Sequence, residues 1–294
     1  MVTSTPVSVS PDHPALGGSP WARVARAIRH EPSALVGLGL VGTYALAAVL
    51  VGTLPLRDPL QLSSDRLAGP SLDFPLGTDA LGRDLLSRIL FGARLSMEVA
   101  VLSVAFAATV GGALGLVSGY AGGLVDLVIG RVMDVFFAFP AILLALGIVA
   151  ALGSDSRNVV IAIAVVYTPI FARVVRGPVL GLKALSFVEA ARAIGATPVR
   201  IVLRHLLPNL VSTIVVQISL ALSWAVLTEG ALSFLGLSAQ PPAPSWGVML
   251  NEGRQNLEFA THLALFPGLA IMLAVLGFNL LGDGLRDALD PQQR

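Results

Sequence analysis

Six long stretches of apolar residues constrain this chain more than any other feature of its sequence. They cover residues 34–54, 95–117, 135–152, 159–175, 211–235 and 263–281. A helix needs about 20 mainly apolar residues to cross a hydrocarbon core of about 30 Å. The sequence therefore predicts an all-α integral membrane protein with about six transmembrane helices. A polar turn at residues 154–158 separates the third and fourth stretches, which also fit a helical hairpin.

Composition supports a chain whose solvent is mostly lipid. The sequence is 55% hydrophobic and 13% charged, whereas a soluble domain carries about 25% charged residues. A net charge of +1 gives no field that would attract nucleic acid. The chain has no cysteine, and its four histidines show no ligand spacing, so we expect no metal site and no bound cofactor.

The distribution of arginine and lysine predicts which ends of the spans face the cytoplasm, because cytoplasmic loops retain basic residues. The segment before the first span contains Arg23, Arg26 and Arg29. The connection between the fourth and fifth spans contains Arg173, Arg176, Lys183, Arg192, Arg200 and Arg204. We expect both segments and both termini to be cytoplasmic, although the first outer loop also contains five arginines, balanced by five aspartates.

Four regions follow from this reading. Residues 1–30 are expected to form a disordered cytoplasmic tail, residues 31–94 a first span with an external loop, residues 95–285 the transmembrane core, and residues 286–294 a cytoplasmic tail. Within the external loop, leucines and isoleucine at helical spacing from Leu81 to Leu90 predict a short helix on the membrane surface. We expect Thr78 or Asp79 to cap it and Asp84 to pair with Arg88.

The inner connection at residues 189–209 predicts two short helices separated by a break. Glu189 suits the start of the first helix, and Gly195 permits a sharp reversal of the chain. Pro198 suits the first turn of the second helix, and Pro208 is expected to end it. The small side chains of the first helix would let another protein approach closely; these are Ala190, Ala191 and Ala193.

This connection resembles the EAA loop of bacterial ABC importer permeases. Its pattern is Glu-Ala-Ala, three residues, Gly, nine residues, a hydrophobic position, one residue and Leu-Pro, which is matched by Glu189, Ala190, Ala191, Gly195, Leu207 and Pro208. His205 departs from the general pattern, but Arg204, His205 and Asn209 are similar to the peptide and nickel branch of the family. Other similar segments are residues 75–94, 232–247 and 279–287, so the resemblance extends from about 32 to 291. The closest likeness is to the second permease of dipeptide and oligopeptide importers.

The resemblance implies a type I ABC importer transmembrane domain in a bacterial inner membrane. It implies a heterodimer with a second homologous permease, two ABC ATPase subunits or domains that bind ATP and Mg, and an external solute-binding protein. It also implies that the EAA loop docks on the ATPase through Glu189, Ala190, Ala191, Gly195, Arg204, His205, Leu207 and Pro208. The cargo would be di- or oligopeptides, with nickel chelates or glutathione as alternatives.

The chain itself is expected not to be an enzyme. Its only lysine, Lys183, is preceded by Leu182 and followed by Ala184, so no Gly-Lys-Ser/Thr phosphate loop is present. An intramembrane hydrolase is a distant alternative that the Gly282-Asp283-Gly284 sequence superficially suggests. A secondary transporter would be expected to show inverted repeats and broken spans, which the sequence does not reveal.

Three polar residues of the fifth stretch are candidates for a substrate pathway. An acid within a span is a functional candidate because its burial is costly, which applies to Glu229. A structural role remains equally open, because Gly230, Ser233 and Gly236 follow it. Gln217 and Trp224 are further candidates, and bonding between helices is their competing role.

Overall fold

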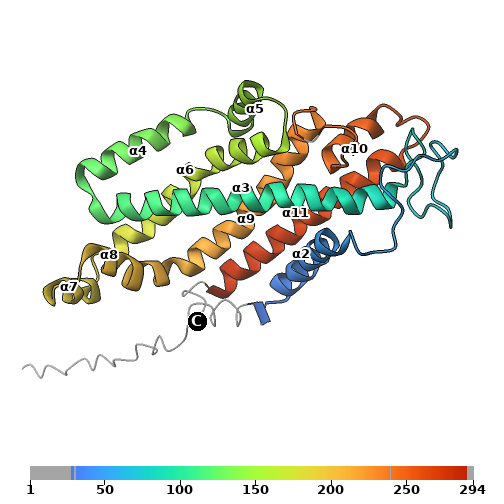
Figure 1. The fold of residues 1–294 in the computed structure, drawn as a ribbon. Coiled ribbons are helices and arrows are strands. Elements are labelled where there is room, and N and C mark those ends of the chain that lie inside the picture. The colour runs from blue at the N-terminus through green and yellow to red at the C-terminus, as the bar shows by residue number, and fades with distance from the viewer. Residues whose placement is uncertain (1–27, 30, 239, 290–294) are drawn as a thin grey trace, which may run out of the picture.

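The computed structural model describes residues 28–29, 31–238 and 240–289, and this part of the chain is almost entirely helical (Figure 1). Nearly all of the predicted N-terminal tail and the last five residues lie outside the described residues. The helices are α2 (Pro32–Leu50), α3 (Leu85–Ala121), α4 (Gly123–Phe137), α5 (Ala141–Leu152), α6 (Ser156–Leu182), α7 (Ser186–Ala193), α8 (Pro198–Ile201), the π-helical η1 (Val202–Leu206), α9 (Leu207–Phe234), α10 (Trp246–Arg254) and α11 (His262–Leu289).

The predicted membrane architecture is confirmed. Five helical segments of the described chain are long and apolar enough to span a membrane, and α4 with α5 makes a sixth if that bent pair is one span. These segments match the six apolar stretches, although α11 continues to Leu289, beyond the expected end of the last span.

The third span differs from expectation because it is broken. α4 and α5 meet at an angle of 88°. Pro140 precedes α5 and has no N–H to continue a helix, and its ring disfavours helical geometry at Phe139. The next turn is as predicted: α5 ends at Leu152, and the Asp155 side chain accepts a hydrogen bond from the Arg157 backbone N–H at the start of α6. α5 and α6 lie against each other as a helical hairpin.

The predicted surface helix over residues 81–90 is wrong. The helix begins at Leu85 and runs without interruption into the second span as α3. Its cap is Asp84, which accepts a hydrogen bond from the Ser87 N–H at 3.0 Å, rather than Thr78 or Asp79. Arg88 does not pair with Asp84 but with Glu252 and Asp79. Because Arg83 and Arg88 are buried, this segment has no polar face to lie on a membrane surface.

The most extensive contact between two helices of the described chain lies between α3 and α6, along the glycines of α3. A Cβ atom added at Gly111 would lie 2.7 Å from Phe171 Cβ, and one added at Gly115 would lie 2.9 Å from Val175 Cβ. Two glycines four residues apart let α3 and α6 approach closely here. Gly112 faces open space.

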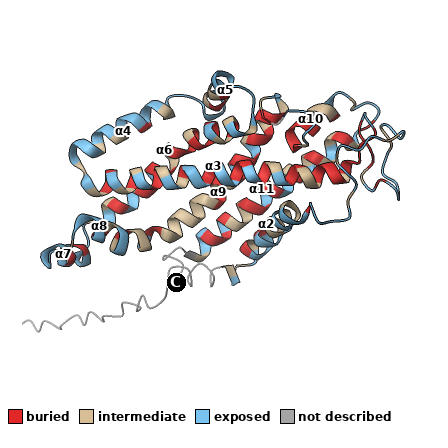
Figure 2. Cartoon of the chain, in the orientation of Figure 1, coloured by how far each residue is buried: buried red, intermediate tan, exposed pale blue. Residues whose placement is uncertain are grey.

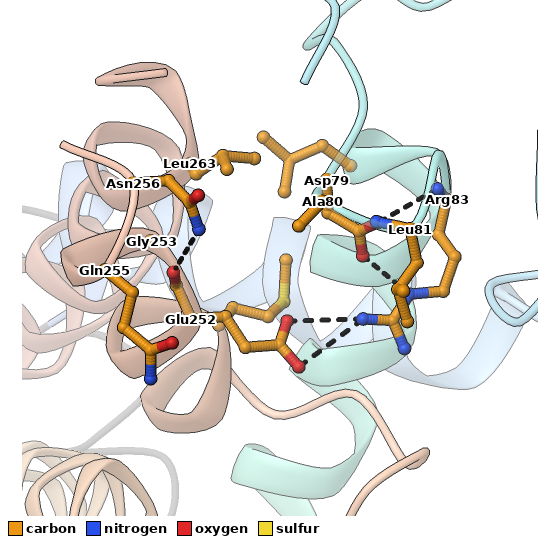
Figure 3. A pocket seen from close by; sticks show the side chains of 11 residues that line it. Asp79, Ala80, Leu81, Arg83, Glu252, Gly253, Gln255, Asn256 and Leu263 are labelled. Atoms are coloured by element: carbon orange, nitrogen blue, oxygen red, sulfur yellow. Dashed lines mark hydrogen bonds and ion pairs between the residues drawn. The ribbon is translucent and has the colours of Figure 1, made fainter. Parts of the chain in front are cut away.

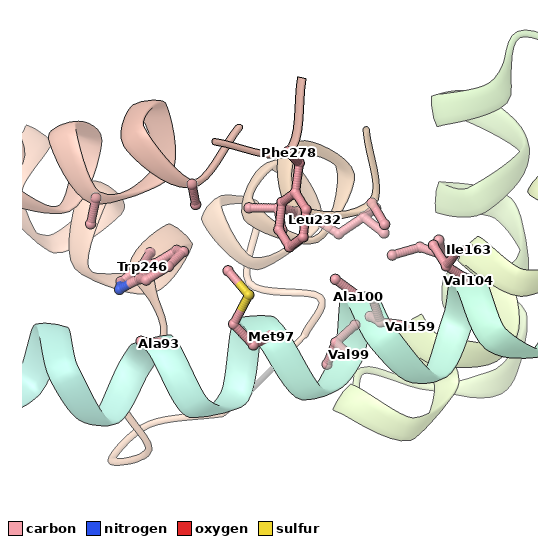
Figure 4. Close-up of a cluster of buried hydrophobic side chains, with 14 of the residues drawn as sticks. Ala93, Met97, Val99, Ala100, Val104, Val159, Ile163, Leu232, Trp246 and Phe278 are labelled. Atoms are coloured by element: carbon pink, nitrogen blue, oxygen red, sulfur yellow. The ribbon is translucent and has the colours of Figure 1, made fainter. Parts of the chain in front are cut away.

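The main core continues from these helices to α9, α10 and α11. Figure 4 shows Met97 of α3, Leu232 of α9 and Phe278 of α11 gathered near Trp246, the first residue of α10. Trp246 is fully buried, and its indole N–H donates to the Ile89 backbone carbonyl at 2.9 Å. This contact fixes α10 against α3.

Candidate functional site

Two candidate regions lie at opposite ends of the bundle. The hairpin of α7 and α8 lies at one end, and α10 with the loop that follows α2 lies at the other (Figure 1). A cavity between α5, α6 and α9 provides a third candidate region. The candidate functional residues predicted from the sequence lie in the hairpin and the cavity, except Glu229. The charged cluster at the α10 end was not predicted.

The reversal in the hairpin depends on Gly195. Its φ is +80°, a left-handed conformation that glycine adopts without a steric penalty. The Gly195 N–H donates to the Arg192 carbonyl at 2.9 Å, and the Ala196 N–H donates to the Ala191 carbonyl at 3.0 Å. These two bonds form a Schellman motif, which satisfies carbonyls at the end of α7. The predicted reversal is confirmed.

The second half of the hairpin is continuous with a membrane span. Thr197 caps α8 and Pro198 occupies its first turn, as expected. The expectation that Pro208 ends this helix is wrong, because the chain continues through η1 into α9, with Pro208 in the first turn of α9. Proline lacks the N–H of a regular α-helical bond, and the π-helical turn lies immediately before it.

The inner face of the hairpin packs against the end of α6. Val188 and Ala191 of α7 and Ile201 of α8 are buried with Val175 and Val179 of α6. Ala191 is 5% exposed, so its methyl group belongs to this contact and does not lie on the outer face as expected. His205 is half-buried, and its ring lies 6.4 Å from the Phe187 ring, between centroids.

The outer face of the hairpin is exposed and partly apolar. Of the residues that the sequence singled out, Glu189, Ala190, Gly195 and Arg204 are exposed, while Leu207 and Pro208 are half-buried. Three large apolar side chains of the same segment are exposed: Ile194 is 85% exposed, Val199 67% and Leu203 57%. Figure 2 shows that much of α7 and α8 is exposed. A contiguous exposed apolar surface marks a site of contact with a protein or with a membrane.

Polar contacts join the hairpin end of α6 to α3 and α4. The Asp126 carboxylate accepts from Arg176 at 2.5 and 2.6 Å and from the Ser118 hydroxyl at 2.5 Å. Lys183 donates to the Gly119 carbonyl at 2.7 Å. Asp126 of α4 therefore pairs with α6, and Asp134 of α4 likewise accepts from Arg173 at 3.2 Å.

The cavity between α5, α6 and α9 has a volume of about 550 Å³. Gln217 and Trp224 line it, together with Tyr167 of α6 and Thr228 of α9. The Tyr167 and Thr228 hydroxyls form a hydrogen bond of 2.9 Å. Trp224 is 62% exposed in this chain. The structure thus brings two of the three pathway candidates to one surface.

Glu229 lies elsewhere. It is 1% exposed and is not among the residues that line this cavity. Its carboxylate accepts from the Ser96 hydroxyl of α3 at 2.8 Å and from the Ser238 hydroxyl at 3.4 Å. The side chain therefore connects the end of α9 to α3 and to the loop after α9.

The charged cluster at the α10 end joins three separate parts of the chain. Figure 3 shows two of them, Asp79 and Arg83 in the loop and Glu252 of α10. Arg83 pairs with Asp79 at 2.6 Å, and its guanidinium also points toward Glu252 at 3.4 Å. Arg88 of α3 pairs with Glu252 of α10 at 3.0 Å. A cavity of about 180 Å³ lies beside the cluster. A pairing between residues 164 positions apart has no local sequence signal.

Comparison with known proteins identifies the family. Residues 111–294 match the family of binding-protein-dependent transport system inner membrane components. The chain is 44% identical to the dipeptide transport system permease protein DppC of Alkalihalophilus pseudofirmus, over 100% of this chain and 97% of that protein. It is 48% identical to the glutathione transport system permease protein GsiD of Pectobacterium atrosepticum, over 93% of this chain and 92% of that protein.

A solved structure gives the same fold. The inward-facing MetNI methionine ABC transporter matches with a TM-score of 0.58 at 19% identity, over 70% of this chain and 98% of the matched chain. The apolar spans, the hairpin and these similarities lead to one conclusion. The chain is a multi-pass member of the binding-protein-dependent transport system inner membrane component family, with the fold of an ABC importer transmembrane domain.

Proposed function

We propose that this chain is one permease subunit of an ATP-driven importer that moves di- or oligopeptides across the bacterial inner membrane. It would pair with a second homologous permease, and two separate ATPase subunits or domains would bind ATP and Mg. An external solute-binding protein would deliver the cargo. The similarity to a dipeptide permease over the whole chain supports the choice of cargo.

The outer face of the hairpin is the observation that carries the coupling role. The inner face of the hairpin is already covered by α6, but Ile194, Val199 and Leu203 remain exposed. A surface of this kind is stabilised when a partner covers it. We assign the contact with the ATPase to this face, with Glu189, Ala190, Gly195 and Arg204 around it, whereas Ala191, His205, Leu207 and Pro208 support the hairpin from within.

Replacement of Gly195 by Asp tests this coupling. A Cβ at Gly195 would meet no atom of this chain within 4 Å, so the substitution does not collide with the fold. It does place a charge on the docking face and strain the left-handed turn. We expect normal membrane insertion and loss of copurification with the ATPase. Full copurification and normal transport would count against the hairpin as the docking element.

The sidedness of the hairpin can be tested directly because the chain has no cysteine. Ala190→Cys introduces one thiol at an exposed position of α7. A membrane-impermeant maleimide should label it only after the membrane is opened. Labelling of intact cells, where Gln61→Cys in the opposite loop serves as the accessible control, would place the hairpin outside and end the proposal.

Glutathione is the second candidate cargo. Its specific support is the similarity to glutathione transport system permeases, which are 47–48% identical to this chain. Measuring the uptake of labelled glutathione and of a labelled dipeptide by the same reconstituted importer distinguishes the two candidate cargoes. ATP-dependent uptake of glutathione alone would replace the peptide assignment.

The cavity between α5, α6 and α9 is our candidate for the substrate pathway. Gln217 and Trp224 line it, and we assign them to the pathway. Glu229 is enclosed by serine hydroxyls, and we assign it a structural role at the end of α9. Glu229→Ala should then lower the thermal stability clearly and change the KM for cargo little. Trp224→Ala should change the KM for cargo clearly and lower the thermal stability little.

A further inference from the structure

α4 is held to the rest of the described chain by little apolar packing. All of its residues are described, and Met133 is the one among them that is buried. It packs against α3 and, less extensively, against α6. Figure 1 shows it running back from the end of α3 toward α5. The polar contacts of α4 therefore matter for where it lies against this chain.

Both ends of α4 are sharp bends. Gly122 and Gly123 connect it to α3 with φ angles of +66° and +53°, a left-handed conformation that glycine adopts without a steric penalty. At the other end, Pro140 precedes α5, which meets α4 at 88°. A helix between two bends can turn as a rigid unit, because only the backbone angles at the bends have to change.

The Asp126 carboxylate is the strongest polar contact of α4 with its neighbours. One oxygen accepts from Arg176 Nε at 2.5 Å, and the other accepts from Arg176 Nη2 at 2.6 Å. The Ser118 hydroxyl of α3 donates to the first oxygen at 2.5 Å. The Asp126 side chain is 19% exposed. A bidentate pair fixes orientation as well as distance, so it ties the start of α4 to α6.

The second ion pair between these two helices is weaker. Asp134 accepts from Arg173 through one contact of 3.2 Å, and the two side chains are 57% and 61% exposed. An ion pair exposed to this degree contributes little to stability. The Arg173 guanidinium also lies over the Phe137 ring, 3.9 Å from its centre, and this contact does not need Asp134. Asp126 is therefore the carboxylate that fixes α4 to α6.

Arg176 belongs to the part of α6 on which the hairpin packs. Its neighbours Val175 and Val179 form the apolar contact with α7 and α8. The Arg192 guanidinium of α7 lies 5.5 Å from the centre of the Tyr120 ring, at the end of α3. Residues 183–185 alone separate α6 from α7. A displacement of the hairpin should therefore move this end of α6, and the Arg176 guanidinium with it.

The far end of α4 leads to the cavity between α5, α6 and α9. Residues 138–140 separate α4 from α5. The first two residues of α5, Ala141 and Ile142, line the cavity. A rotation of α4 should therefore displace this part of the cavity wall.

We propose that Asp126 and Arg176 are positioning residues that couple α4 to the hairpin, so that movement of the hairpin turns α4 and shifts the α5 wall of the cavity. This inference rests on the proposed function. It gives the hairpin a second connection to the cavity, separate from the continuous segment of α8, η1 and α9.

Asp126→Asn tests the coupling in the whole importer, reconstituted in proteoliposomes with its ATPases, its external binding protein and the peptide Ala-Ala-Ala. Asparagine keeps the shape of the side chain and removes the charge that pairs with Arg176. We expect unchanged copurification of the ATPase and about tenfold fewer peptides taken up per ATP hydrolysed, a factor typical of coupling between two sites. A loss of folded importer alone would lower uptake and hydrolysis together and leave this ratio unchanged.

Asp134→Asn is the matched control, because it makes the same chemical change on the same helix at the exposed pair. Its ratio of uptake to hydrolysis should stay within about twofold of the unmodified importer. The double variant Asp126→Arg with Arg176→Asp exchanges the two charges and should restore most of the lost ratio. Should Asp126→Asn fail to assemble, Arg176→Lys keeps the charge without the bidentate geometry and should lower the ratio by a smaller factor.

The outcomes separate this inference from the proposed function. An unchanged ratio in assembled Asp126→Asn, or equal decreases in Asp126→Asn and Asp134→Asn, would overturn the coupling role. Loss of ATPase copurification in Asp126→Asn would also overturn it, because the pair would then shape the docking surface instead. Absence of ATP-dependent uptake of any peptide or of glutathione by the unmodified importer would overturn the proposed function itself.

Discussion

The two ends of this molecule differ in which side chains they bury and which they expose. At the α10 end, four charged side chains neutralise one another within the chain, and Arg88 is 1% exposed although it is an arginine. At the hairpin end, Ile194 is 85% exposed although it is an isoleucine. The polar residue is buried and the apolar residue is exposed, which is the reverse of the usual arrangement in a monomeric protein.

The difference indicates which end is stabilised by contacts within this chain and which end keeps an exposed apolar surface. The charged cluster connects the loop after α2, α3 and α10 through contacts made entirely by this chain. That end should keep its shape in the isolated subunit. The inner face of the hairpin is covered by α6, and Ile194, Val199 and Leu203 remain exposed. Substitutions at the two ends should accordingly affect different measurements.

Arg88→Ala should have the largest effect on the stability of the isolated chain. It leaves the Glu252 carboxylate without its 3.0 Å partner and removes a cation beside Asp79. Breaking a buried ion pair from one side costs about 3–5 kcal/mol, and the lower value applies here because Glu252 is partly exposed. Thermal unfolding in detergent measures the loss. Arg66→Ala, at an exposed position of the same loop, should leave the unfolding temperature unchanged.

Gly115→Leu should have the next largest effect, through the contact of α3 with α6. The new side chain would meet Val175, and overpacking of this kind costs about 1–3 kcal/mol. Gly112→Leu is the matched control, because a Cβ there meets nothing within 4 Å. Equal unfolding temperatures for the two variants would contradict the packing described here.

These first two predictions differ in how far the sequence anticipates them. The spacing of Gly111 and Gly115 is a local signal for close packing, and the long apolar runs likewise mark the spans. The cluster of Arg83, Arg88 and Glu252 was not anticipated, since helical spacing alone predicted a surface helix in which Arg88 pairs with Asp84. Only the folded chain brings α10 to α3, so a burial that depends on this contact leaves no local pattern.

The hairpin shows the same division. Gly195 and Pro198 predict a reversal and a helix start from backbone chemistry alone. Pro208 misled the sequence reading because a proline can end a helix or stand in the first turn of the next one. In the folded chain the π-helical turn η1 lies between α8 and α9, and Pro208 stands in the first turn of α9. Which side Ala191 faces was likewise set by α6.

Gly195→Ala should have a smaller effect on stability, about 1 kcal/mol, from the left-handed conformation alone. Gly130→Ala is the same chemical change inside α4, at a position with open space, and should be slightly stabilising. Differential scanning calorimetry of the two purified variants checks that their unfolding temperatures shift in opposite directions. A destabilised Gly130→Ala variant would show that the change itself, rather than the turn, is responsible.

Arg204→Ala should have the smallest effect. The side chain is exposed, and an exposed charge at the rim of a contact contributes about 0–1 kcal/mol. We expect unchanged unfolding and a modest decrease in copurified ATPase at matched expression. Ile194→Ser should decrease the copurified ATPase more, because it removes exposed apolar area from the same hairpin. If Arg204→Ala decreased the copurified ATPase more than Ile194→Ser, the contact would be mainly electrostatic.

The continuity of α8, η1 and α9 has a consequence for how motion at the hairpin reaches the middle of the membrane. One helical segment of 37 residues, Pro198–Phe234, contains both the α8 helix of the hairpin and the cavity-lining residues Gln217 and Trp224. A π-helical turn holds about one residue more than an α-helical turn. Tightening η1 to α-helical geometry would therefore rotate everything beyond it by about 100° about the helix axis. A rearrangement of a single turn would thus replace the amide of Gln217 with an apolar neighbour at the same depth.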